Sequence, residues 1–191
     1  DSQRPERANP AIKRSIIFSP HPDDDVISMG GTFIRLVDQG HDVHVAYQTS
    51  GNNAVWDDDA LRFMEFSIDL SKNLGLNDEA LNNTYKKLKS FIAQKNPNQK
   101  DPEDLRLIKG LIRKGEATAG ARYCGLRDQN IHFMDMPFYE KRKSSRKNEI
   151  SKEDVEVTKE LLQKIKPHQI FAAGDFADPH GTHKICFEAV K

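Results

Sequence analysis

The apolar run Ser15-Ile16-Ile17-Phe18 is followed at once by Ser19-Pro20-His21-Pro22-Asp23-Asp24-Asp25. A short apolar run with β-branched and aromatic side chains predicts a buried strand. One histidine and three carboxylates therefore leave the end of that strand. The same order recurs near the other end of the chain, where Asp178-Pro179-His180-Gly181-Thr182-His183 follows the apolar run Gln169-Ile170-Phe171-Ala172-Ala173. Two strand ends that each carry His and Asp predict a metal site at the carboxyl edge of a parallel sheet.

Strands and helices alternate along the chain. We expect strands at residues 15–19, 41–47, 130–134 and 169–173, and helices at residues 26–39, 57–73, 78–94, 103–126 and 151–166. The last of these helices begins with a capping signal, Ser151-Lys152-Glu153-Asp154. This alternation indicates an α/β fold with a mainly parallel sheet. Ligands bind outside the carboxyl ends of the strands in such sheets, which is where both clusters fall.

The length of 191 residues is that of one domain with a sizeable core. Residues 1–14, with two prolines and alternating charge, are interpreted as a linker or arm. They do not begin with Met, and the other end of the chain stops at Lys191 within a helix-like pattern. We therefore expect residues 15–191 to be one domain, truncated at its C-terminus, of a longer protein.

The amino-acid composition limits the classes of binding partner to be expected. The 29 basic and 29 acidic residues cancel, so long-range electrostatics give no argument for nucleic acid or an anionic membrane surface. No apolar run approaches the roughly 20 residues of a membrane span, and no signal peptide is recognised. Cys124 and Cys186 lie far apart and form no C-x-x-C motif. We expect a cytoplasmic protein with a small-molecule substrate; the sequence leaves the oligomeric state open.

The two clusters supply the parts for metal-assisted hydrolysis. A catalytic Zn²⁺ commonly takes three His and Asp/Glu ligands and keeps one position open for water. The candidates are His21, one of Asp23 and Asp24, and one or both of His180 and His183. The remaining carboxylate could be the general base, and the remaining histidine could stabilise an oxyanion or protonate the leaving group. The residues alone do not decide which aspartate binds the metal.

Each motif also has a simpler interpretation. Asp24 or Asp25 could cap a helix that begins near Val26, and H-x-x-H could be two surface histidines. An H-x-D motif with a distant histidine is also the triad of non-haem Fe(II) oxygenases, but those that we know have an all-β fold. The other histidines lie within strands or at their amino edge, and we interpret them as structural: His41, His44, His132 and His168.

Three motifs resemble those of a known family. The stretch Ile16 to Asp25, with Gly30-Gly31 downstream, resembles the A-H-P-D-D-E signature of the LmbE/PIG-L deacetylases. His180-x-x-His183 resembles the second motif of that family, and Arg113-Lys114-Gly115-Glu116-Ala117-Thr118-Ala119 resembles its R-x-x-E-x-x-A helix. The resemblance spans the chain from Ser15 onward. It implies a Rossmann-like three-layer sandwich and a zinc-dependent hydrolase that removes an N-acetyl or N-acyl group from a glucosamine-type sugar.

The resemblance also implies roles for single residues. It implies three metal ligands for Zn²⁺ or Fe²⁺, namely His21, Asp24 and His183. Asp23 would be the general base, and His180 would stabilise the tetrahedral oxyanion. Arg113 would contact the substrate.

The chain departs from the family pattern at two places. Asp25 stands where the family usually has Glu, and the segment 56–102 looks longer than in the compact members, which would reshape the pocket. The chain most resembles LmbE-like domains fused behind a glucosamine-6-phosphate deaminase-like domain. That resemblance implies amino-sugar metabolism and an upstream domain in the same polypeptide. The alternative is a non-catalytic or regulatory domain of such a longer protein.

Overall fold

The computed structural model describes residues 10–76, 78–141, 149–174, 177 and 181–191, so most of the expected linker at 1–14 lies outside the described residues. The chain divides into two compact units. Residues 1–50 and 116–191 form one, here called the sheet unit, and residues 51–115 form the other, here called the helical unit.

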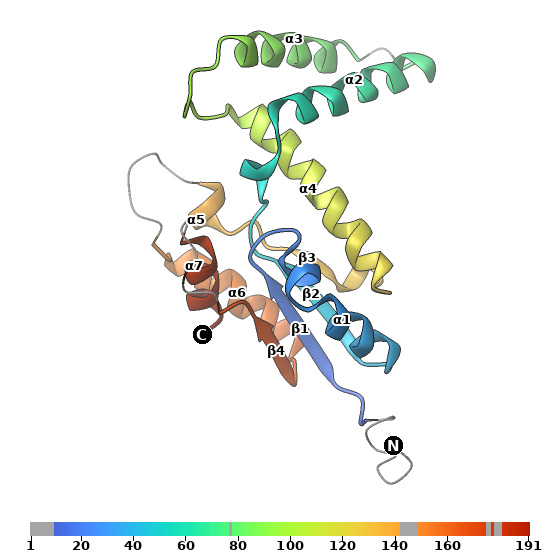
Figure 1. Cartoon of the computed structure of the whole chain (residues 1–191), viewed down its shortest axis with the longest axis vertical. Coiled ribbons are helices and arrows are strands. Elements are labelled where there is room, and N and C mark those ends of the chain that lie inside the picture. The colour runs from blue at the N-terminus through green and yellow to red at the C-terminus, as the bar shows by residue number, and fades with distance from the viewer. Residues whose placement is uncertain (1–9, 77, 142–148, 175–176, 178–180) are drawn as a thin grey trace. The chain divides into compact units, whose positions relative to one another are not determined.

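The sheet unit is built on four parallel strands in the order β3-β2-β1-β4 (Figure 1). The strands are β1 (Arg14–Ser19), β2 (Asp42–Tyr47), β3 (Ile131–Phe133) and β4 (Gln169–Ala172). Each agrees with its predicted bounds to within one residue at either end. The first strand lies between two neighbours, and its residues 15–19 are all buried.

Helices cover both faces of this sheet (Figure 1). Successive side chains of a strand point to opposite faces, so Ile17 packs on one side and Ile16 and Phe18 on the other. The first face is covered by α1 (Asp24–Asp38) and by the end of α4 (Glu103–Tyr123), and the second by α6 (Lys152–Ile165) and α7 (Thr182–Val190). The predicted α/β three-layer sandwich with a parallel sheet is therefore confirmed. It is not the all-β fold that the Fe(II) oxygenase alternative requires.

The capping signal of the predicted helix at 151–166 is confirmed. The Ser151 hydroxyl accepts a hydrogen bond from the Asp154 backbone N–H at 3.2 Å, and the Asp154 carboxylate accepts one from the Ser151 N–H at 2.8 Å. A further short helix, α5 (Pro137–Glu140), was not predicted. It has only four residues, too few to show a period in the sequence.

The first helix begins earlier than predicted. It starts at Asp24, not near Val26, so Asp24 and Asp25 lie inside its first turn and do not cap it. Asp23 holds the N-cap position without a capping hydrogen bond from its side chain. A strand residue supplies the missing acceptor instead, because the Ser19 hydroxyl accepts from the Asp25 N–H at 3.0 Å. The interpretation of the aspartates as caps is therefore wrong.

The fourth helix ends at Tyr123, before the predicted residue 126. Gly125 has a φ of +93°, and the Leu126 N–H donates back to the Ala121 carbonyl at 3.0 Å, which closes the helix end. A β-carbon on this glycine would lie 2.8 Å from Cγ1 of Val37. Glycine is therefore favoured here by both backbone conformation and space.

The helical unit includes the whole of the segment 56–102. It consists of α2 (Asp57–Asn73), α3 (Glu79–Ala93) and the first part of α4. Its helices pack around a small apolar core: Ala60, Met64, Leu88 and Leu105. The predicted bounds of the first two helices are confirmed to within one residue.

Four charged side chains of the helical unit form a closed ring of ion pairs. Lys95 and Lys109 each contact both Asp57 and Asp101, with N–O distances between 2.6 and 2.8 Å. Burial raises the pKa of Asp57, but the hydrogen bonds from the two lysines outweigh it and hold this pKa below its ordinary value. The two positive and two negative charges of this ring cancel. Its ion pairs join Asp57 to Lys95 and Lys109, which are far from it in sequence.

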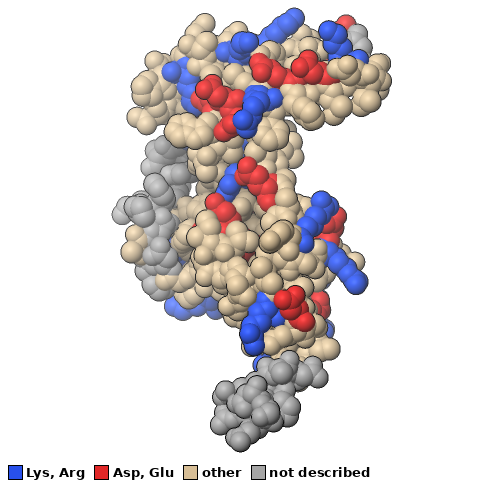
Figure 2. All heavy atoms as spheres, turned by 45° about the vertical axis from the view of Figure 1, so that its right-hand side comes forward, with Lys and Arg blue, Asp and Glu red and all other residues tan. Residues whose placement is uncertain are grey.

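The surface carries both signs of charge. On the face drawn in Figure 2, Lys and Arg side chains lie among Asp and Glu side chains in each unit. Among the residues that the structure describes, every helix is too short or too polar to cross a bilayer.

The first prediction concerns Gly125. Gly125→Ala should lower the free energy of unfolding by about 2–4 kcal/mol, because the new methyl group meets Val37 and the left-handed conformation is strained. Gly115→Ala is the control, since a β-carbon at that helical position meets no described atom within 4 Å. It should be neutral or stabilise by up to about 1 kcal/mol. Urea unfolding measures both, and equal effects would contradict this account of the helix end.

The second prediction concerns Asp57. Asp57→Asn should lower the free energy of unfolding by about 1–3 kcal/mol at neutral pH, because two lysines lose a charged acceptor. The folded-state pKa of Asp57 lies below its unfolded value, so its contribution is present above the unfolded pKa of about 4 and is lost as the pH falls through the folded pKa. The difference between parent and variant should therefore shrink in acid. Asp58→Asn, at the exposed neighbouring position, is the control, and a pH-independent difference would refute the assignment.

Candidate metal centre

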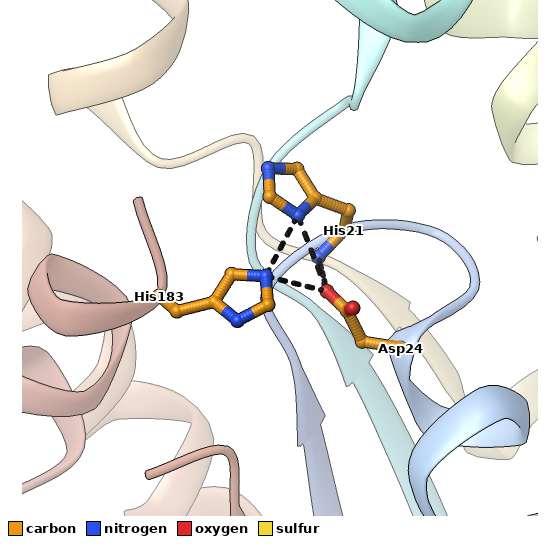
Figure 3. A group of neighbouring side chains, drawn as sticks. All are labelled: His21, Asp24 and His183. Carbon is orange, nitrogen blue, oxygen red and sulfur yellow. Dashed lines mark hydrogen bonds and ion pairs between the residues drawn. The ribbon is translucent and has the colours of Figure 1, made fainter. Parts of the chain in front are cut away.

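Three candidate ligands point toward one another at the carboxyl edge of the sheet (Figure 3). His21 lies in the loop after β1, Asp24 is the first residue of α1, and His183 is the second residue of α7. Oδ2 of Asp24 lies 3.2 Å from Nδ1 of His21 and 3.2 Å from Nε2 of His183. The two histidine nitrogens are also 3.2 Å apart. The three atoms thus form a nearly equilateral triangle.

This triangle fits a small divalent cation. Tetrahedral bonds of about 2.0–2.1 Å to zinc place ligand atoms about 3.3–3.4 Å apart. Two imidazole nitrogens and one carboxylate oxygen are also a ligand set that catalytic zinc sites use, with another position left open. The same donors suit Fe²⁺. The chemistry and the spacing of the donors are therefore compatible with a metal site.

Oδ2 of Asp24 takes part in two of the three contacts, one with each histidine. Its carboxylate also accepts a hydrogen bond from the backbone N–H of His21 at 2.8 Å. Burial raises the pKa of Asp24, but the hydrogen bonds from His21 and the charge of His183 outweigh it and hold this pKa below its ordinary value. The ionised carboxylate is the form that binds a metal.

Asp25 faces a different partner. It is buried, and its carboxylate accepts a hydrogen bond from the Tyr47 hydroxyl at 2.9 Å, with Oγ of Ser19 at 3.3 Å. Burial raises the pKa of Asp25, although the hydrogen bond from Tyr47 opposes the shift. Burial and the charge of Asp25 also raise the pKa of Tyr47. Tyr47, the last residue of β2, therefore holds the side chain of Asp25, which directly follows the candidate ligand Asp24.

Two of the other predicted site residues, Asp23 and Arg113, lie in the described part of the chain, and neither belongs to the triangle. Asp23 directly precedes α1 and is partly exposed, and its side chain is not among the three clustered ligand atoms. His180 lies outside the described residues. Arg113 lies in α4, within the helical unit.

The remaining histidines make structural contacts away from the centre. Nδ1 of His44 lies 3.0 Å from Nε2 of His132, and the two rings stack. Burial lowers the pKa of both, that of His132 to about 4. The rings of His41 and His168 accept backbone hydrogen bonds from residues at the amino edge of the sheet. These placements agree with the structural roles expected for them.

A pocket borders two of the candidate ligands. It has a volume of about 540 Å³, and Asp24 and His183 form part of its wall. The rest of the wall comes mainly from β1, β4 and the start of α1 and is largely apolar: Ile17, Phe18, Met29, Ile170, Phe171 and Ala172. Space for part of a small molecule therefore lies beside the centre.

Sequence reasoning missed the residues that follow β2. Thr49 is buried, and its hydroxyl donates to the Pro20 carbonyl at 2.7 Å, next to His21. Gln48 is also buried, and its amide donates to the Cys186 carbonyl in α7 at 2.9 Å. One signal could have found them, because a polar run follows the predicted second strand and so falls at the same sheet edge. No comparable signal marks Tyr47.

Comparison with known proteins places the chain in a family. Residues 16–191 match PIG-L, described as GlcNAc-PI de-N-acetylase. Over all 191 residues the chain is 51% identical to a putative glucosamine-6-phosphate deaminase-like protein of Bacteroides thetaiotaomicron. The chain covers 29% of that relative, so it spans less than a third of the relative's length. Because the family match runs from the second residue of the first predicted strand to the last residue, the chain belongs to the PIG-L (LmbE-like) family.

Proposed function

We propose that the chain is a zinc-dependent amide hydrolase that removes an N-acetyl or N-acyl group from a glucosamine-type sugar. The observation that carries this proposal is the triangle of His21, Asp24 and His183, found in a chain of a family described as a de-N-acetylase. The name of the relative, which refers to glucosamine-6-phosphate, supports an amino sugar as substrate.

The three residues of the triangle are the proposed metal ligands. When bound, zinc supplies Lewis-acid chemistry, since it polarises a carbonyl oxygen and lowers the pKa of water to about 7. His21 and Asp24 would hold it from the β1–α1 loop, and His183 would hold it from α7. Fe²⁺ remains the second metal that this donor set accepts.

Asp23 is the proposed general base. Its carboxylate would take a proton from the attacking water as the water oxygen bonds to the amide carbon. The same carboxyl group would then return the proton to the sugar nitrogen as the carbon–nitrogen bond breaks. The products are a carboxylate and a free amino sugar. Asp23 suits this role because it is partly exposed and directly precedes Asp24, a proposed metal ligand.

Two further roles rest on position in the family motifs. His180, three residues before His183, is proposed to stabilise the oxyanion that develops on the amide oxygen. Arg113 is proposed to contact the substrate. An arginine can pair with a phosphate or a carboxylate through two parallel hydrogen bonds.

We further propose that residues 15–191 act as one domain of a longer polypeptide, with residues 1–14 as a linker or arm. The short coverage of the relative supports this view. The cytoplasm is the proposed site of action, where the free cysteines Cys124 and Cys186 would stay reduced.

The third prediction concerns metal binding. Asp24→Ala and His183→Ala should each weaken Zn²⁺ binding by about 100-fold or more, since each removes one of three ligands. His41→Asn is the matched control, because this histidine lies at the opposite edge of the sheet and only accepts a backbone hydrogen bond there. Competition with a chromophoric chelator measures the affinities. Unchanged affinity in both alanine variants would show that the metal, if bound, lies elsewhere.

The fourth prediction separates the two aspartates. Asp23→Asn should keep the Zn²⁺ affinity of the parent and lower kcat for deacetylation by about 10²–10⁴-fold, because it removes only the proton acceptor. Acetate release from N-acetylglucosamine and its 6-phosphate provides the assay. Loss of zinc from Asp23→Asn would instead mean that the roles of Asp23 and Asp24 are reversed.

A further inference from the structure

The loop that carries His21 is tied at both ends by one buried hydroxyl. Ser19 Oγ donates to the His21 carbonyl at 2.6 Å and accepts from the Asp25 N–H at 3.0 Å. The residue itself is fully buried. These two hydrogen bonds span the segment that holds His21 and Asp24, so the ends of that segment are fixed by β1 itself.

Strand β2 fixes the same loop from the side. Its pairing with β1 continues beyond both strands, since the N–H groups of Gln48 and Thr49 donate to the carbonyls of Ser19 and Pro20 at 2.9 and 3.1 Å. The Thr49 hydroxyl donates to the Pro20 carbonyl as well, at 2.7 Å. A carbonyl oxygen has two lone pairs. Thr49 uses both lone pairs of the Pro20 oxygen, one through its backbone N–H and one through its hydroxyl. The peptide immediately before His21 is therefore held in place by Thr49.

The residue before Thr49 fixes the other half of the centre. The amide of Gln48 donates to the carbonyl of Cys186 in α7, one helical turn after His183. Both Gln48 and Thr49 have about 1% of their surface exposed. Gln48 and Thr49, which directly follow β2, thus contact the two segments that supply the histidines. Gln48 contacts α7, which carries His183, and Thr49 contacts the loop that carries His21.

We propose that Gln48 and Thr49 are positioning residues for the metal centre, which together set the distance between His21 and His183. This inference rests on the proposed function, because it assumes that these side chains bind a metal. Neither side-chain contact is needed for strand pairing, since the paired register of β1 and β2 ends at Ser19 and Tyr47. Ligands held in place before binding lose less freedom on binding, and loss of such supports typically weakens metal affinity about 10–100-fold.

Thr49→Val tests this inference. Valine has the shape of threonine and keeps the backbone N–H, but it lacks the hydroxyl. We expect Zn²⁺ affinity to fall by about 10–100-fold and the visible spectrum of the Co²⁺-substituted protein to change. Thr49→Ser restores the hydroxyl and should recover affinity to within about threefold of the parent. Gln48→Met, which removes the amide donor, should weaken affinity in the same direction.

A buried threonine elsewhere provides the matched control. Thr158 has the same exposure as Thr49, and its hydroxyl also donates to a backbone carbonyl, that of Asp154 at 3.0 Å, but within α6. Thr158→Val should lower the unfolding free energy of the metal-free protein by a similar amount to Thr49→Val, and leave Zn²⁺ affinity and the Co²⁺ spectrum unchanged.

The outcomes distinguish this inference from the proposed function. A parent protein that binds no divalent cation would overturn both. A parent that binds Zn²⁺, with Thr49→Val binding it equally well, would overturn the positioning role alone. The same conclusion would follow if Thr158→Val weakened Zn²⁺ binding as much as Thr49→Val does, because the effect would then be one of general stability.

Discussion

The parallel pairing of β1 with β2, continued past the ends of both strands, is the constraint on which the rest of the sheet unit depends. The hydrogen bonds from the Gln48 and Thr49 N–H groups to Ser19 and Pro20 fix the position of the chain at the carboxyl end of β1. His21 directly follows Pro20. His21 and the carboxylates after it therefore follow the buried residues 15–19 of β1 closely in sequence. The hydrogen bonds to Ser19 and Pro20 hold this part of the chain in place.

The second half of the centre depends on the same strand. β4 pairs with β1 on its other side, so α7 begins near the loop that carries His21. Residues 172 and 183 are far from residue 21 in sequence, but the parallel register pairs Ala172, at the carboxyl end of β4, with Phe18 near the carboxyl end of β1. Hydrogen bonds from the extension of β2 then reach both segments.

The sequence predicts those features that depend on local patterns. Apolar runs locate the four strands, and the Ser151 cap marks the start of α6 because its hydrogen bonds join residues three apart. Features set by distant residues are not predictable in this way. The start of α1 depends on the Ser19 hydroxyl, and the end of α4 depends on Gly125 facing Val37. The position of Asp24 likewise depends on the fold, since its Oδ2 lies 3.2 Å from a nitrogen of each histidine.

The most direct test of the central claim is a crystal structure of the protein grown with Zn²⁺, with anomalous scattering recorded at the zinc edge. The account predicts a single strong anomalous peak about 2.0–2.2 Å from Nδ1 of His21, a carboxylate oxygen of Asp24 and Nε2 of His183. A protein without a peak at this place, or with its strongest peak between His44 and His132, would contradict the claim that the edge of this sheet is a metal centre.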